Sequence, residues 1–159
     1  MKKFELTSEF VTFLGKKLFR IKALISFGNV KEGELGGYVE KEENLSNDGN
    51  AWVSGDAEVS GNARVSGNAW VSGNARVSGN AMVHGDADYA TVQGFGSEYR
   101  TTTFFRTKAG DIGVRCGCFY GTLEEFRAKV KETHGETKTA KEYLMVADLM
   151  EFRFSEEEV

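Results

Sequence analysis

The sequence predicts a mainly β protein built around a short parallel β-helix, and three observations carry this prediction. A motif of six residues repeats almost letter for letter from Val53 to Asp88, beginning VSGDAE, VSGNAR, VSGNAW. Glycine occurs 19 times and proline not once, so tight turns must be made by Gly, Asn and Asp, which tolerate positive φ. Complete helix signals occur in the last third of the chain. We therefore expect short strands and turns first and helices at the end.

The repeat determines which side chains face inward. Each unit has Val at its first position, Gly at its third and Ala at its fifth, and the sixth position varies. A glycine in every unit, and an apolar spacing that does not match 3.6 residues per turn, argue against a helix. In short strands separated by Gly-Asn turns, Val and Ala point to one face, whereas Ser and the variable residue point outward. Regular hexapeptide repeats are typical of parallel β-helices.

The pattern Val-x-Gly-Asn/Asp-Ala-x is similar to the hexapeptide repeat of left-handed β-helix proteins, in which three hexapeptides form one triangular coil. This resemblance implies about three coils, with two between Val53 and Asp88 and part of another from Leu45 to Trp52. It also implies a homo-oligomer, because proteins of this fold commonly form trimers.

Residues 19–53 resemble, more narrowly, the N-terminal cap of hexapeptide-repeat proteins of unknown function from phages and prophages. This resemblance implies a phage accessory protein made in the bacterial host cytoplasm. The matching positions are Arg20, Ile21, Ala23, Leu24, Phe27, Val30, Gly33, Gly36, Gly37, Glu40, Leu45 and Ser46.

The flanks of the repeat divide the chain into three segments. Residues 1–44 are expected to form a hairpin around residues 14–17 and a cap over the open end of the β-helix. Residues 45–94 hold the repeat, and residues 95–159 are expected to form a small β-hairpin followed by two helices. In the first helix Thr122 is the expected N-cap, Glu125 completes a capping box, and Gly135 ends the helix. Residues 139–152 predict the second helix.

The composition argues against two classes of partner. A formal net charge of −4 argues against a protein that mainly neutralises nucleic-acid phosphates. No apolar run approaches the ~18 residues that a transmembrane helix needs, and the N-terminal residues do not resemble a signal peptide. We therefore expect a cytoplasmic protein without a membrane partner, in which Cys116 and Cys118 are reduced thiols.

The variable residues are expected to stack in columns, because positions one coil apart lie at the spacing of adjacent strands. The expected columns are Trp52 on Trp70, Glu58 on Arg76, and Arg64 on Met82. Glu58 and Arg76 would form an exposed ion pair. Two exposed indoles would form an apolar patch, for which we keep three explanations open: a subunit interface, a surface covered by the C-terminal helices, or a platform for a ligand or partner.

Catalytic and metal-binding readings have weak support in the sequence. His84 replaces the outward Ser of the repeat and could act as the general base of an acyl-CoA-dependent acyltransferase, although few coils and no long loop leave little room for the cofactor. Cys116 and Cys118, together with His134, could suggest zinc, but structural zinc needs four ligands and a wider cysteine spacing. A charged His134 at a helix end is explained by the helix dipole. We expect no metal and no cofactor.

The favoured hypothesis is a non-catalytic, oligomeric binding protein. In the phage context that the resemblance implies, it would antagonise host antiphage defence by sequestering a nucleotide second messenger or by binding a defence protein. A nucleotide site needs arginines near aromatic rings. The candidate binding residues are Trp52, Trp70, Arg64, Arg76, Arg106 and Arg115, with Arg100 and Phe119 also available. The alternative is the acyltransferase with His84 as its base.

Overall fold

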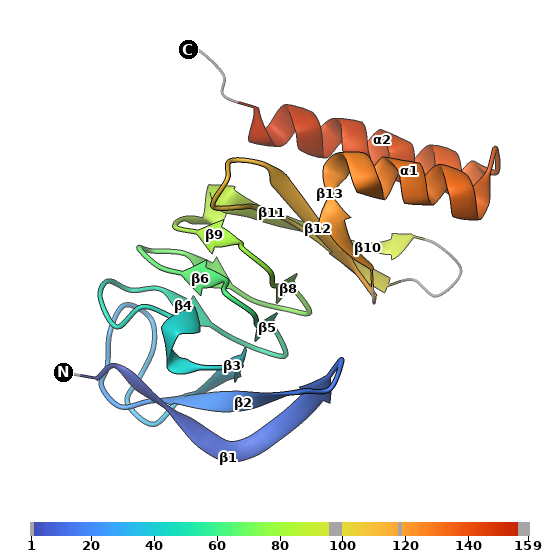
Figure 1. Cartoon of the computed structure of the whole chain (residues 1–159). Coiled ribbons are helices and arrows are strands. Elements are labelled where there is room, and N and C mark those ends of the chain that lie inside the picture. Colours follow the sequence, from blue (N-terminus) through green and yellow to red (C-terminus); the bar gives the residue numbers. More distant parts are fainter. Residues whose placement is uncertain (1, 96–99, 118, 156–159) are drawn as a thin grey trace.

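The computed structural model describes residues 2–95, 100–117 and 119–155, and the chain is mainly β (Figure 1). A hairpin lies at one end of the molecule, a row of short strands occupies the middle, and a sheet covered by two helices lies at the other end (Figure 1). Within the described ranges, no helix combines the length and the apolar composition that crossing a bilayer requires.

The repeat forms short strands that pair in parallel with the strand one coil further on. These strands are β4 (Trp52–Val53), β5 (Glu58–Val59), β6 (Arg64–Val65), β7 (Trp70–Val71), β8 (Arg76–Val77) and β9 (Met82–Val83). β4 pairs with β7, β5 with β8, and β6 with β9. In register, Trp52 lies opposite Trp70, Glu58 opposite Arg76, and Arg64 opposite Met82. The predicted columns are therefore confirmed.

The inward Val and Ala side chains form the core of this tract. Every one of them is 0–1% exposed: Ala51, Val53, Ala57, Val59, Ala63, Val65, Ala69, Val71, Ala75, Val77, Ala81 and Val83. The repeat glycines make the corners. Gly67 has φ of +62°, and a Cβ atom added there would lie 2.3 Å from the carbonyl oxygen of His84. The inward positions and the turn glycines thus follow the sequence prediction.

The hairpin consists of β1 (Phe4–Phe13) and β2 (Lys16–Ala23), joined at Leu14 and Gly15, as predicted. β2 pairs antiparallel with β3 (Leu35–Val39), and β3 pairs in parallel with β5. The result is one five-stranded sheet in the order β1-β2-β3-β5-β8. The hairpin is therefore continuous with one face of the repeat.

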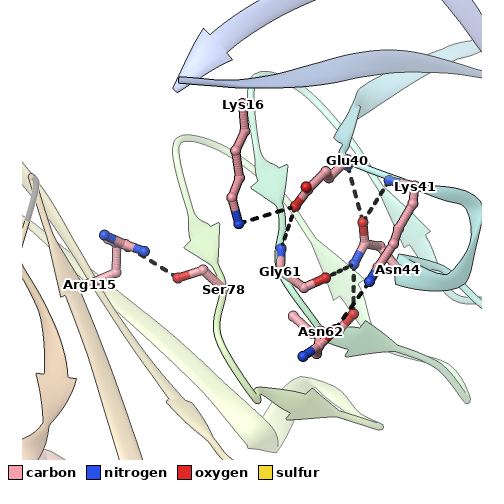
Figure 2. Close-up of polar contacts among 9 residues, drawn as sticks. Lys16, Glu40, Lys41, Asn44, Gly61, Asn62, Ser78 and Arg115 are labelled. Carbon is pink, nitrogen blue, oxygen red and sulfur yellow. Dashed lines mark hydrogen bonds and ion pairs between the residues drawn. The ribbon is translucent and has the colours of Figure 1, made fainter. Parts of the chain in front are cut away.

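The carbonyl groups at the upstream end of the repeat are bonded by residues outside it. The Tyr38 N–H donates to the Ala57 carbonyl at 2.9 Å, and the buried Lys3 ammonium donates to the Ala51 carbonyl at 2.7 Å. Figure 2 shows that Asn44, from the short 3₁₀ helix η1 (Glu42–Asn44), donates its side-chain amide to Gly61 O at 3.2 Å. The same amide donates to Ala63 O at 2.9 Å. Donor groups thus complete the ladder at this end.

Acceptor groups complete the ladder at the downstream end. An Asp86 carboxylate oxygen, on η2 (Asp86–Asp88), accepts from the Trp70 N–H at 2.8 Å. The Thr103 hydroxyl oxygen accepts from the Arg76 N–H at 2.9 Å. At each end, residues outside the repeat thus provide partners for backbone groups that have no further coil to bond to.

The C-terminal third contains a four-stranded antiparallel sheet, so the prediction of a hairpin was incomplete. Its strands are β10 (Tyr89–Phe95), β11 (Arg100–Arg106), β12 (Ile112–Cys116) and β13 (Phe119–Thr122), paired in that order. Residues 89–94 were assigned to the repeat segment, but β10 pairs with β11, and its Ala90 and Val92 pack toward the helices. This packing makes the segment an added strand.

Two helices cover one face of this sheet, α1 (Leu123–His134) and α2 (Lys138–Phe154) (Figure 1). The capping box of α1 is as predicted: the Thr122 hydroxyl accepts from the Glu125 N–H at 3.2 Å, and the Glu125 carboxylate accepts from the Thr122 N–H at 2.9 Å. Gly135 ends the helix. The helices and the sheet enclose a second core, separate from that of the repeat.

Candidate functional site

A pocket of about 380 Å³ lies between α1, α2 and one end of the C-terminal sheet. At this end β10 and β12 finish and β11 and β13 begin, because neighbouring strands run antiparallel. Helix α1 adds a row of side chains one turn apart, and α2 adds Tyr143. The lining residues are Phe95, Arg100, Cys116, Phe119, Phe126, Lys129, Val130, Thr133, His134 and Tyr143.

Aromatic rings form the inner walls of the pocket. Phe126 and Tyr143 meet edge to face with ring centres 5.8 Å apart, and His134 lies nearly parallel to Tyr143 at 6.1 Å. Phe119 packs against Phe126 at 6.0 Å, and Phe95 against Tyr143 at 6.3 Å. These contacts order the rings, of which Phe126 and Tyr143 are buried and Phe95 and Phe119 are half-buried.

The rim of the pocket is cationic. Its cations are Arg100, from the start of β11, and Lys129, from α1. Among the described lining residues there is no carboxylate. Lys129 also forms an exposed ion pair with Glu132, with 4.0 Å between nitrogen and oxygen. Such an exposed pair is weak, so an incoming anion can compete with Glu132 for Lys129.

Two polar groups lie deeper in the pocket wall. Burial, and next the charge that Cys116 carries when ionised, raise the pKa of Tyr143 above its ordinary value. Its hydroxyl therefore stays protonated at neutral pH and can donate a hydrogen bond. The Cys116 thiol accepts a hydrogen bond from the Thr102 hydroxyl at 3.2 Å. The pocket thus combines donors, cations and ring surfaces.

The predicted exposed pair of tryptophans is wrong. Trp52 is 0% exposed, because the segment after β2 folds over it and Phe27 contacts its ring edge on, at 5.4 Å. Trp70 is half-buried, and its indole N–H donates to the Ser54 hydroxyl at 2.9 Å. Trp52 belongs to the same buried core as the Val and Ala side chains of the repeat and as Phe4 and Ile21 of the hairpin. The two indoles therefore do not form an exposed pair.

Arg76 and Arg115 meet at Phe13, at the tip of the hairpin, and not in the pocket. Their guanidinium carbons lie 4.4 Å and 5.2 Å from the centre of the Phe13 ring. Figure 2 shows the second contact of Arg115, whose Nε donates to the Ser78 hydroxyl at 3.1 Å. The expected exposed ion pair of Arg76 with Glu58 is half-buried, at 3.5 Å. Burial raises the pKa of Glu58, against the opposite effect of Arg76.

Arg64 and Arg106 lie elsewhere again. Arg64 is exposed on β6 and lines a different hollow with Lys41 and Lys108. Arg106 pairs with Asp88 at 3.0 Å and donates to the Phe154 carbonyl at 3.0 Å, so it ties the repeat to α2. The predicted arginines thus do not converge on one site. The two residues named as also available, Arg100 and Phe119, do line the pocket.

Three residues were missed by sequence reasoning, namely Lys129, Tyr143 and Phe95. Lys129 lies one turn after Phe126 on the α1 face that meets the sheet, and helical spacing could have placed it there. Phe95 could not be placed, since its strand was not predicted. Tyr143 lies on the packed face of α2, and that face also borders the pocket.

The catalytic and metal hypotheses involve other positions. His84 is exposed, and its Nδ1 lies 3.0 Å from the Ser66 hydroxyl oxygen. The acyltransferase with His84 as its base stays a prediction. Cys118 lies outside the described residues, whereas Cys116 and His134 both line the pocket. Within the described part of the chain, no group of three His, Cys, Asp or Glu side chains could hold a metal ion.

Comparison with known proteins bears on the repeat. A family model described as YdcK Beta solenoid repeat matches residues 57–73 and residues 69–85. The central tract is a β-solenoid repeat. The two adjacent matches cover β5 to β9 and the turns between them, and they leave both flanks unmatched. No curated protein matches the chain.

Proposed function

We propose that this protein is a non-catalytic binding protein and that the pocket beside α1 takes a small anion carrying a flat ring, such as a mononucleotide-sized ligand. One observation carries the proposal: the cationic side chains of Arg100 and Lys129 and several aromatic rings line one cavity, with no carboxylate among its described residues. Ligand clefts usually measure about 300–1,000 Å³. A pocket of about 380 Å³ therefore suits a small ligand.

Each group has a defined role in this proposal. The Arg100 guanidinium offers a planar fork that matches a phosphate or carboxylate, and Lys129 adds a mobile point charge. The rings of Phe95 and Phe119 offer surfaces for the flat part of the ligand. The protonated Tyr143 hydroxyl donates to an acceptor on it.

The wider setting of the proposal comes from the sequence. Pairing of strands one coil apart supports a left-handed hexapeptide β-helix, and the bonds from Lys3, Tyr38 and Asn44 to the first coil support a capping role for residues 1–44. The resemblance of residues 19–53 supports a phage accessory protein. Such a protein would sequester a nucleotide second messenger in the host, with the solenoid as its rigid support. Masking of a host defence protein is the related alternative.

The first experiment is a thermal-shift panel of the purified chain with mononucleotides, cyclic di- and trinucleotides, and acetyl-CoA. A ligand at a hundred times its dissociation constant stabilises the fold by about 2.7 kcal/mol. We expect a nucleotide to raise the unfolding temperature. A shift with acetyl-CoA alone, lost in His84→Ala, would support the acyltransferase instead.

Substitutions of pocket residues test whether the ligand binds in this pocket. Arg100→Gln and Lys129→Gln should each weaken the affinity for the nucleotide that gives a shift by roughly tenfold, the loss of one charge-assisted contact. Lys131→Gln is the matched control, because Lys131 is exposed on the same helix and does not line the pocket. Unchanged affinity in both pocket variants, or a panel without any shift, would contradict the proposal.

A further inference from the structure

A second hollow, of about 360 Å³, lies on the side of the solenoid where Arg64 is exposed, and we call it the Arg64 hollow. Its cationic side chains come from three different elements. Lys41 immediately precedes η1, Arg64 lies on β6, and Lys108 follows β11. No described residue lines both this hollow and the pocket beside α1. The side chains that would hold a ligand in one cavity are therefore distinct from those of the other.

Hydrogen bonds fix the backbone at two of these cations. The Lys108 N–H donates to the Asn80 carbonyl at 2.8 Å, which ties the turn after β11 to the solenoid. The Lys41 N–H donates to the side-chain oxygen of the buried Asn44 at 2.9 Å. The Lys41 ammonium in turn donates to the side-chain oxygen of Asn62 at 3.1 Å (Figure 2). The fold itself therefore brings cations from distant parts of the sequence to one hollow.

The Arg64 hollow has a local excess of positive charge. Lys41, Arg64 and Lys108 share it with a single described carboxylate, that of Glu43. Among the residues that the structure describes, no carboxylate forms an ion pair with the side chain of Arg64 or of Lys108. The chain as a whole has a formal net charge of −4, so the excess is confined to this region. Like charges that share a hollow repel one another, and a bound anion relieves that repulsion.

We propose that the Arg64 hollow binds a small phosphorylated ligand through a doubly charged phosphate group. The Arg64 guanidinium offers a planar fork to two phosphate oxygens, and the two lysines add charge-assisted contacts. Asn62 and Asn80, one coil apart, line the same hollow, and their side-chain amides can donate to further oxygens of the ligand. The volume lies near the lower end of the usual range for ligand clefts, about 300–1,000 Å³, which suits a small molecule.

A small ligand fits this hollow better than a long polyanion does. A nucleic-acid strand would extend beyond the three cations, over a chain in which 24 acidic residues outnumber 20 basic ones. The carboxylate of Glu43 at the hollow would also repel a continuous row of phosphates. The inference goes beyond the proposed function and does not rest on it, because the two cavities have no described lining residue in common.

Isothermal titration calorimetry of the full chain with pyrophosphate, at low ionic strength, tests this site. We expect Arg64→Gln and Lys108→Gln each to weaken the affinity by roughly tenfold, the loss of one charge-assisted contact. Arg153→Gln is the matched control, because Arg153 is exposed on α2 and does not line the hollow. Arg100→Gln alters the pocket beside α1 and should leave the binding that depends on Arg64 unchanged.

Removal of the acidic charge tests the same site in the opposite direction. Glu43→Gln takes the one described carboxylate from the hollow and should strengthen the binding of pyrophosphate by roughly two- to fivefold. Glu42→Gln is its control, because Glu42 lies next to Glu43 on η1 but pairs with Lys2, at 2.7 Å, and does not line the hollow. Thermal unfolding of each variant checks that the fold is retained.

Four outcomes would overturn the inference. They are no binding of pyrophosphate, an affinity that neither Arg64→Gln nor Lys108→Gln changes, a Glu43→Gln variant that binds more weakly, and a single-stranded oligonucleotide that binds more tightly than pyrophosphate. Binding that is lost in Arg100→Gln and kept in Arg64→Gln is a case of the second outcome. It would place the anion in the pocket beside α1, so it would support the proposed function while it overturned this inference.

Discussion

Lys3 is a buried cation that donates hydrogen bonds to backbone carbonyls at the upstream end of the repeat. Its side chain is 1% exposed, and its ammonium donates to the carbonyls of Ala51 and Gly49 at 2.7 and 3.4 Å. Burial lowers the pKa of Lys3 to about 8, partly opposed by Asp48. At neutral pH the folded protein therefore holds the charged Lys3 ammonium in surroundings that disfavour the charge. The hydrogen bonds to the two carbonyls offset part of this cost.

The Lys3 pKa predicts a pH dependence of stability. Between pH about 8 and the ordinary lysine pKa of 10.5, the unfolded chain binds a proton that the folded chain has lost. The wild-type free energy of unfolding should therefore rise across this window relative to that of Lys3→Met. Denaturant unfolding at several pH values measures the difference. Lys2→Met, at an exposed neighbour, is the control, and a wild-type advantage that falls with pH would contradict the assignment.

Substitution of the repeat glycines by alanine should lower the free energy of unfolding by different amounts at different positions. Gly67 and Gly73 have φ of +62° and +67°, so alanine is strained at both. A Cβ at Gly67 meets the His84 carbonyl, whereas one at Gly73 meets nothing within 4 Å. We expect Gly73→Ala to cost about 1–2 kcal/mol, and Gly67→Ala to cost at least ~2 kcal/mol more. Equal costs in chemical denaturation would show that the backbone gives way freely at Gly67.

Among the elements, those with local signals could be predicted and those made by distant partners could not. The register of β4 to β9 follows from the constant six-residue period of the repeat, and the capping box of α1 follows from residues three positions apart, so the sequence was sufficient for both. β10 exists because β11 and the helices pack on it. The cover of Trp52 comes from Phe27, which no repeat rule places there. An outward position on a solenoid is exposed only if no flanking segment covers it.

The residues of the candidate site also fall into those that the sequence could place and those that it could not. Arg100 and Phe119, which were named from the sequence as available for a nucleotide site, both line the pocket. The other arginines could not be sorted, because their partners come from other elements: Phe13 from the hairpin for Arg76 and Arg115, and Asp88 for Arg106. These contacts depend on how the hairpin, the solenoid and the C-terminal sheet pack together.

Asn44 of the short helix η1 bonds the backbone at the upstream end of the repeat, and substitution can test this role. Asn44 is fully buried. Its side-chain oxygen accepts hydrogen bonds from the N–H groups of Glu40 and Lys41, at 3.1 and 2.9 Å. Its side-chain NH₂ group donates to two carbonyls of the first coil. Asn44→Asp keeps the acceptor and removes the donors. We expect a loss of ~2–4 kcal/mol in unfolding free energy, because two carbonyls lose partners and a carboxylate faces them.

Asn62→Asp serves as the control for this substitution. Its side chain accepts from Lys41 at an exposed position, at 3.1 Å, and so should change the stability little. Comparable losses in the two variants would show that the donors of Asn44 do not complete the ladder.

At the scale of the molecule, one strand belongs to both cores. Phe105 on β11 packs into the core of the repeat, and its neighbour Phe104 packs into the core under the helices. Both are 0% exposed. Since adjacent residues of a strand point to opposite faces, β11 joins the two cores rigidly.

This shared strand predicts one cooperative unfolding transition. Both tryptophans of the chain lie in the solenoid, and both long helices lie in the C-terminal third. Tryptophan fluorescence and helical circular dichroism should therefore change at the same denaturant concentration, and Phe105→Ala should lower both midpoints together. Transitions that separate in the wild type would mean that the two cores unfold independently.

The position of Phe13 relative to Arg115 depends on the number of coils in the repeat. Near-identical repeats are easily gained or lost when a gene is copied, and a solenoid by itself tolerates any number of coils. One further coil would carry Arg115 away by about 4.8 Å. The Phe13 ring, now 4.4 Å from Arg76 and 5.2 Å from Arg115, would then no longer reach both. We therefore expect that an added coil would break one of the two contacts at the hairpin tip.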